Sequence, residues 1–263
     1  MISPREMSNG HSSHAPCKDN LTVAAIAVAA ASITTTAHEA IGHGSACLAM
    51  GGRITQLTSV YFNCTPGNLW IAIGGPAGNL SAAAIAWLAL RLVPPRLLRL
   101  RLLLSLVMLL SLFWEAGYVI YAMVLNEGDW AIAARDAFGE PSWWWRIGGA
   151  ALGLVLYRIG TRFIASSTRF AESLGVSPAW ALRIAWLSAS LGACLAALLY
   201  APDRLEALHQ AALEIGAASF PLLIVRPRMD ASHPGPIDGY IGWVLFAAVL
   251  YAAFALTLGR GLP

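Results

Sequence analysis

Six long apolar runs, divided by short polar stretches, set the pattern of this sequence. Each run is close to or longer than the ~20 residues that an α-helix needs to cross the hydrocarbon core of a bilayer. The runs are Leu21–Met50, Leu69–Val93, Leu102–Leu125, Trp143–Ile164, Pro178–Leu199 and Tyr240–Leu258. The pattern predicts an all-α integral membrane protein with about six transmembrane helices.

Three stretches, at least in part outside the runs, differ from them in composition. Residues 51–67 carry Thr, Val, Ile, Tyr and Phe between Gly and Pro residues, which predicts a short β-like strand or hairpin at the membrane edge. Residues 202–219 place apolar residues at helical spacing with acidic residues between them, which predicts an amphipathic helix on the surface. Residues 1–20 are polar and lack the apolar core of a signal peptide, so we expect a disordered tail.

The composition agrees with a membrane protein. The chain is 57% hydrophobic and 12% charged, which is about half the charged fraction of a soluble domain. We therefore expect membrane lipid as a partner. The net charge of +3 comes from Arg residues scattered between the runs, so no nucleic-acid partner is expected. If the N-terminus is cytoplasmic, 11 of the 17 Lys and Arg residues lie on the cytoplasmic side of the membrane and 6 on the other, which predicts that both termini are cytoplasmic. We expect the plasma (inner) membrane.

The spacing of the four cysteines gives no sign of a disulfide framework. They are Cys17, Cys47, Cys64 and Cys194, and no two have the CxxC spacing. We therefore expect neither a disulfide framework nor a cysteine-based zinc site. Cys47 and Cys194 lie within apolar runs, where cysteine is usually a small core residue.

The chemical signal is the sequence HEAIGH at residues 38–43, inside the first apolar run. Ionisable side chains within a membrane span are unfavourable and usually functional. The sequence is close to the zinc-binding HExxH signature, in which two His residues four apart bind the metal and the Glu activates water. Here His38 and His43 are five apart, and five residues of a regular α-helix turn about 140° beyond a full circle.

Two arrangements reconcile this spacing with a metal site. A π-bulge absorbs one extra residue and would bring His38 and His43 together, with Glu39 over the metal and Gly42 easing the bulge. Alternatively, Glu39 and His43, four apart, bind the metal while His38 supports them. We favour the π-bulge.

A third ligand has to come from elsewhere in the chain, since a catalytic zinc has three protein ligands and an open position. The best candidate is Asp129, just past the third run, and Glu127 is the next. Glu115 lies in the middle of that run. It fits either an interhelical hydrogen bond or a position near the metal.

The sequence GGPAGN at residues 74–79 enters the second run. Small residues allow close helix packing, and within this stretch Asn79 could add a polar contact to the site.

These three features together resemble the site-2 protease family of intramembrane zinc metalloproteases, over residues 24–130. The resemblance implies zinc as the cofactor, with His38, His43 and Asp129 as ligands and Glu39 as the general base. It also places the segment with Gly75, Pro76 and Asn79 near the site. Two features depart from the family pattern, because the HExxH has one extra residue and no Pro precedes Asp129.

The resemblance divides the chain into the tail 1–20, a metalloprotease-like transmembrane core 21–135, and additional helices with the surface amphipathic helix, 136–263. It implies hydrolysis of peptide bonds in a transmembrane protein or peptide substrate. With the N-terminus inside, the three motifs fall toward one face. A catalytically inactive scaffold and a metal or ion transporter are the alternatives, although a transporter usually spreads its ligands over several helices. The sequence leaves the substrate and the oligomeric state open.

Overall fold

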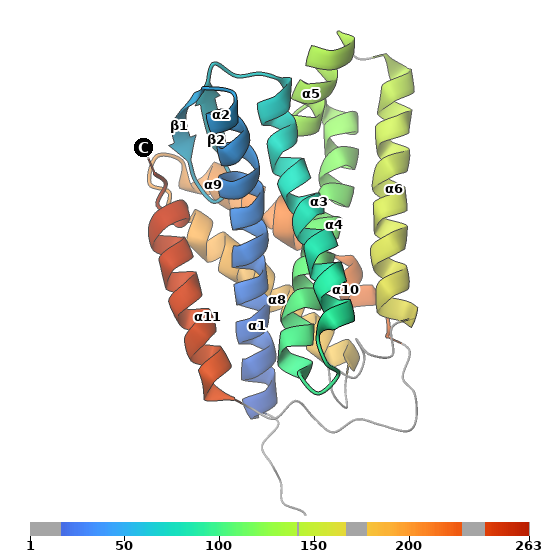
Figure 1. The fold of residues 1–263 in the computed structure, drawn as a ribbon, viewed down its shortest axis with the longest axis vertical. Helices are drawn as coiled ribbons and strands as arrows, with labels where there is room; N and C mark the ends of the chain where they lie inside the picture. The colour runs from blue at the N-terminus through green and yellow to red at the C-terminus, as the bar shows by residue number, and fades with distance from the viewer. Residues whose placement is uncertain (1–16, 141, 167–177, 228–239, 263) are drawn as a thin grey trace, which may run out of the picture.

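The computed structural model describes residues 17–140, 142–166, 178–227 and 240–262, which form an elongated, mostly helical bundle (Figure 1). The elements in chain order are α1 (Cys17–Thr36), the π-helix η1 (Ala37–Gly44), α2 (Ser45–Ala49), β1 (Arg53–Leu57), β2 (Phe62–Thr65), α3 (Leu69–Leu92), α4 (Leu98–Leu125), α5 (Asp129–Phe138), α6 (Trp143–Ser166), α8 (Pro178–Ala197), α9 (Arg204–Ala211), the π-helix η2 (Ala212–Ala217), α10 (Pro221–Ile224), α11 (Ile241–Phe254) and the π-helix η3 (Ala255–Gly259).

Six helices in the described ranges are long and apolar enough to cross a membrane, which confirms the number read from the sequence. They are Asn20–Ala49, Leu69–Leu92, Leu98–Leu125, Trp143–Ser166, Pro178–Ala197 and Ile241–Gly259. Most of the expected tail, residues 1–16, lies outside the described residues, and α1 begins at Cys17, ahead of the expected start at Leu21.

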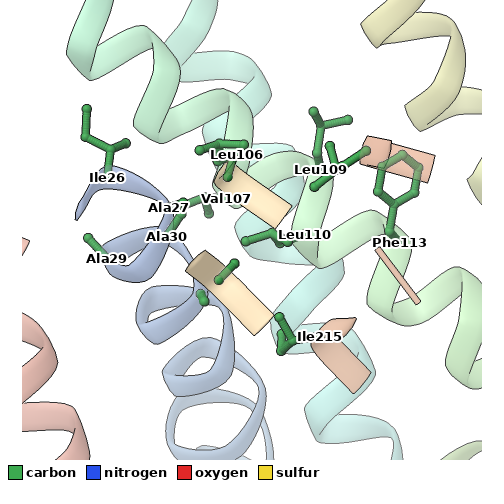
Figure 2. Close-up of a cluster of buried hydrophobic side chains, with 14 of the residues drawn as sticks. Ile26, Ala27, Ala29, Ala30, Leu106, Val107, Leu109, Leu110, Phe113 and Ile215 are labelled. Carbon is green, nitrogen blue, oxygen red and sulfur yellow. The ribbon is translucent and has the colours of Figure 1, made fainter. Parts of the chain in front are cut away.

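The helix α1 lies at the centre and packs against α4, α8 and α11. Its packing face is made of small side chains, among them the fully buried Ala27 and Ala30, which let the larger side chains of α4 approach. Figure 2 shows Leu106 and Leu110 of α4 next to Ala27 and Ala30. Such small-to-large packing holds membrane helices together by close van der Waals contact.

The expected hairpin is present. β1 and β2 pair antiparallel, and Leu57 of β1 also pairs with Leu262 at the other end of the chain. Cys47, at the end of the first long helix, forms a disulfide with Cys64 of β2, with the two Cα atoms 6.0 Å apart. The expectation of no disulfide was therefore wrong, because the hairpin folds back over α2 and brings together two cysteines that have no signature spacing.

The two ends of the described chain lie at opposite ends of the bundle. Tyr240, just before α11, donates its backbone N–H to Thr22 near the start of α1, at 3.2 Å. At the other end of α11, Leu262 pairs with β1. The helices α1 and α11 therefore run parallel, as Figure 1 also shows. This arrangement contradicts the expectation that both termini lie on one side.

The reversal comes from the segment between α8 and α11. Tyr200, just before α9, accepts a hydrogen bond from Gln56 of β1 at 2.6 Å, so α9 starts at the hairpin end. Figure 1 shows α10 in the opposite half of the bundle. α9, η2 and α10 thus pass along the bundle in short pieces that hydropathy windows do not detect. The expected surface helix over 202–219 is helical, but η2 packs inside against α8 and α4, with Ile215 buried.

Candidate metal centre

The π-helix η1 brings the two histidines onto one face. In its eight residues, Ala37–Gly44, π-helical hydrogen bonds replace the α-helical ones, at the point where the sequence has one residue more than HExxH. A π-helix bonds residue i to residue i+5, so residues five apart lie one above the other. His38 and His43 are both buried, and their ring centroids are 4.9 Å apart. This arrangement is the π-bulge expected from the sequence.

Asp129 reaches the two imidazoles from the start of α5. The helix α4 ends with Asn126 in the left-handed conformation, φ 62°, and Gly128 has φ 79°, so the chain turns sharply back over α4. The Asp129 Oδ2 atom then lies 3.1 Å from His43 Nε2 and 3.4 Å from His38 Nε2. A tetrahedral zinc ion with bonds of ~2.05 Å would hold its ligand atoms about 3.3 Å apart.

These three residues form a group that could hold a metal ion. Their ligand atoms all lie within 4.8 Å of one another. Without an ion, protonated Nε2 atoms of His38 and His43 donate to Asp129 Oδ2. Burial raises the pKa of Asp129, but these hydrogen bonds outweigh burial and hold the pKa below its usual range. A bound metal ion would take the place of these two protons.

Gly75 lets the backbone of α3 approach the two imidazoles closely. A Cβ built on Gly75 would overlap both Nε2 atoms, those of His38 and His43. We call the small region between Gly75 and the two Nε2 atoms the cradle, and any side chain at position 75 would intrude on it. Gly42 and Gly74 allow the approach of the two helices, because a Cβ on Gly42 would overlap the carbonyl oxygen of Gly74. The GGPAGN stretch, with Pro76 inside α3, thus lies against η1.

The backbone of α3 sets the tautomer of His43. His43 Nδ1 lies 2.7 Å from the carbonyl oxygen of Ile71 and 3.2 Å from the backbone nitrogen of Gly75. Since a carbonyl only accepts, the closer contact places the ring proton on Nδ1 and leaves the lone pair of Nε2 for an ion. This is the usual support of a metal-binding histidine. Phe62 of β2 stacks on the His43 ring, with the two ring centroids 5.1 Å apart.

A buried carboxylate supports His38. Glu115 Oε1 lies 3.3 Å from His38 Nδ1 and accepts from Asn79 Nδ2 at 2.8 Å. Glu115 Oε2 accepts from the indole of Trp130 at 3.0 Å. Asn79 Nδ2 also lies 3.0 Å from His38 Nδ1, so that nitrogen either accepts from Asn79 or donates to Glu115. Only the second leaves Nε2 free for an ion. Trp114 stacks on the ring, with centroids 4.5 Å apart.

Glu39 has a buried oxygen without a partner. Its side chain belongs to η1, is 3% exposed, and its Oε2 atom forms no hydrogen bond with any residue in the described ranges. Burying an unmatched polar atom is unfavourable, so such an atom usually serves a ligand or a reaction. It is one helical position from His38.

The structure brings together most of the expected site residues. Glu127, the second choice for the third ligand, is exposed and accepts from Tyr121 instead. Sequence reasoning missed Tyr118, whose hydroxyl donates to Asp129 Oδ2 at 3.3 Å and accepts from the Asp129 N–H at 3.1 Å. Its spacing three residues after Glu115, on the same helical face, could have indicated it. Trp130 and Phe62 had no such signal, because both come from segments that turn back.

Comparison of this chain with protein-family models, with curated proteins and with solved structures finds no match. A functional assignment for this chain therefore rests on the geometry of the site alone.

Proposed function

We propose that this protein is an intramembrane zinc metallopeptidase that resembles the site-2 protease family and hydrolyses peptide bonds of membrane-embedded substrates. The observation that carries the proposal is the group His38, His43 and Asp129, together with the unpartnered buried oxygen of Glu39, the residue after His38. Two imidazoles and a carboxylate are ligands that zinc commonly takes. Three protein ligands leave one position open, which is the pattern of a catalytic site rather than a structural one.

Each residue has a defined part in this mechanism. A zinc ion in the cradle would polarise the scissile carbonyl and acidify a water molecule. Glu39 would take the proton of the attacking water and deliver it to the leaving amine. Glu115 and the Ile71 carbonyl would hold the two imidazoles in the tautomer that binds metal, by accepting from each Nδ1–H. The buried surroundings keep bulk water away from these groups.

The membrane environment belongs to the same proposal. The helices α6 and α11 carry large apolar side chains on their exposed faces, for example Leu154 and Val249, which suits lipid contact. The Cys47–Cys64 disulfide lies at the hairpin end. Disulfides persist in oxidising compartments, which favours an extracytoplasmic hairpin and a cytoplasmic start of α1.

The metal content of protein purified in detergent without chelators tests the site. We expect about one zinc per chain in the wild type and none in His43→Ala or Asp129→Ala. The matched controls are His209→Ala, an exposed histidine of α9, and Asp136→Ala, an exposed acid on α5, and both should keep the zinc. A wild type without stoichiometric metal would contradict the proposal.

The chemistry is tested with Glu39→Gln, which should keep the zinc and lose hydrolysis by at least about 100-fold, because the proton acceptor is gone. The readout is mass spectrometry of membranes from cells that express either form. New peptide termini within apolar segments should form only with the wild type. Equal fragment patterns, with zinc present in both forms, would instead indicate a catalytically inactive scaffold.

A further inference from the structure

A cavity of about 420 Å³ lies between α4, α6 and η2. Its volume falls within the range of small-ligand sites. The wall includes Tyr118 and Tyr121 of α4, Tyr157 of α6 and Leu213 of η2. Most of the other lining residues are alanine, glycine or aliphatic, and Glu214 is the only charged one among them.

Glu214 is a buried acid without a partner. It is 9% exposed, it lines the cavity, and no hydrogen bond or ion pair joins its carboxyl to another residue of the described segments. The acid cannot be explained as part of a surface helix, because η2 is packed between α8 and α4. A carboxyl in an apolar wall is unfavourable unless water or a ligand in the cavity supplies a hydrogen-bond donor.

The wall that carries Glu214 is firmly positioned. Tyr157 donates its hydroxyl to the carbonyl of Ala218 at 3.0 Å, and Trp186 donates its indole N–H to the carbonyl of Gly216 at 2.8 Å. Gly117 of α4 allows the close approach, because a Cβ there would lie 2.8 Å from the Ala218 Cβ. The backbone around Glu214 is a π-helix within a segment of short helical pieces. At membrane depth such irregular backbone occurs where it is buried in protein or lines a cavity.

The cavity adjoins the metal centre. Tyr118 lines the cavity, and its hydroxyl is the group bonded to Asp129. A molecule that occupies the cavity is therefore separated from Asp129, the candidate metal ligand, by the side chain of Tyr118. The protein donors in the lining are engaged elsewhere, because the hydroxyls of Tyr118, Tyr121 and Tyr157 donate to Asp129, Glu127 and Ala218, and the Gln210 amide donates to Glu206. A ligand with an N–H group would therefore find the Glu214 carboxyl free to accept.

We propose that this cavity binds an unwound apolar stretch of a peptide, and that the Glu214 carboxyl accepts a hydrogen bond from a backbone N–H of that peptide. The naming of a peptide as the ligand rests on the proposed function. An unwound segment in apolar surroundings exposes backbone N–H groups that have no acceptor, and each needs one. The carboxyl oxygens supply it, while the aliphatic and tyrosine side chains take the apolar residues of the peptide.

The test measures binding without hydrolysis. The probe is the peptide dansyl-Leu-Ala-Leu-Ala-Leu-amide, titrated into protein in detergent with EDTA present. Wild type is compared with Glu214→Gln, which keeps an acceptor oxygen, and with Glu214→Leu, which removes it. The matched control is Glu206→Leu, an exposed acid on α9. A second probe is the same peptide methylated at its backbone nitrogens, which has no N–H to donate.

We expect wild type, Glu214→Gln and Glu206→Leu to bind alike, and Glu214→Leu to bind about tenfold more weakly. The methylated peptide should bind the wild type about as weakly, and the mutation should not weaken it further. Equal binding by all variants, or equal binding of the two peptides, would overturn the proposal and indicate an apolar cavity that any lipid chain could fill. Equally weak binding by Glu214→Gln and Glu214→Leu would also overturn it.

This result is independent of catalysis. Because EDTA is present, a protein that holds no zinc or cleaves nothing still gives a clear answer about the cavity. Conversely, the protein could prove to be a zinc-dependent peptidase whose peptide affinity does not depend on Glu214. The proposed function would then stand, and the proposed role of Glu214 would be overturned. The methylated peptide needs no mutation, so the test stands even if Glu214→Leu does not fold.

Discussion

Gly75 faces the imidazole Nε2 atoms of His38 and His43 from the neighbouring helix. At this position the absence of a side chain is what matters, because the nearest atoms to a Cβ would be the two candidate ligand atoms. Gly42 has a different role, since it lets the backbone of α3 approach η1. Glycine thus has two separate roles here, one at the candidate metal site and one at the helix contact.

The substitution Gly75→Ala should abolish metal binding, because the added methyl would occupy the space that an ion needs. Metal analysis of the purified protein checks this, with a melting curve to show that the bundle is still folded. The matched control is Gly148→Ala on α6, where a Cβ meets nothing within 4 Å. That variant should bind as much zinc as the wild type, and a Gly75→Ala protein with full zinc would show that the cradle is elsewhere.

At the scale of the element, the π-helix η1 resolves the irregular spacing of the histidines. The extra residue relative to HExxH is absorbed locally, and α1 and α2 continue on either side as one long helix. Ile41, within η1, is 62% exposed, so the bulge turns an apolar side chain outward rather than into the site. The neighbouring glycines make room for the wider turn.

Deleting Ile41 should therefore convert the π-helix to an α-helix and keep the site. The sequence would then read HEAGH, and two histidines four apart converge on an α-helix. We expect about one zinc per chain, measured as above, and a melting temperature within a few degrees of the wild type.

The control deletion is Ala27, which is fully buried in the regular part of α1. Removing a residue there rotates the flanking helix by about 100°, which should unfold the protein or lose the zinc. If both deletions lost the zinc alike, the π-helix would be essential in itself rather than a local accommodation of one residue.

For the whole molecule, the direction of α11 decides the topology. The segment α9–η2–α10 returns along the bundle, so α11 starts beside α1 and ends at the hairpin. The hairpin, the end of α11 and the start of α5 then share one end of the bundle, as Figure 1 shows. The metal centre lies toward this same end, since it includes Asp129 at the start of α5.

Cysteine labelling checks this topology. In a Cys17→Ser, Cys194→Ser background, Arg53→Cys in β1 and Arg260→Cys after α11 should react with a membrane-impermeant maleimide on intact cells. Arg96→Cys, beyond the far end of α3, should react only after permeabilisation, because all three sites are exposed but lie on two sides. If Arg260→Cys behaved like Arg96→Cys, the two termini would share a side and the direction of α11 would be wrong.

The sequence by itself determined the number of long helices, the hairpin and the candidate ligands. The length of an apolar run can be read directly from the sequence, so the six helices follow from local composition. His38, Glu39 and Asp129 stand out for the same kind of reason, because ionisable groups within or beside an apolar run require an explanation. Even the π-helix could be expected, since five residues do not bring two side chains together on an α-helix.

Only the tertiary structure decided which distant groups meet. The disulfide between Cys47 and Cys64, the hydrogen bond from Trp130 to Glu115, and the burial of Glu214 all depend on where the chain turns back. Short helical pieces such as η2 carry no hydropathy signal long enough to reveal that they pass through the bundle. Contacts of this kind arise from the packing of all the elements at once, and no local pattern in the sequence records them.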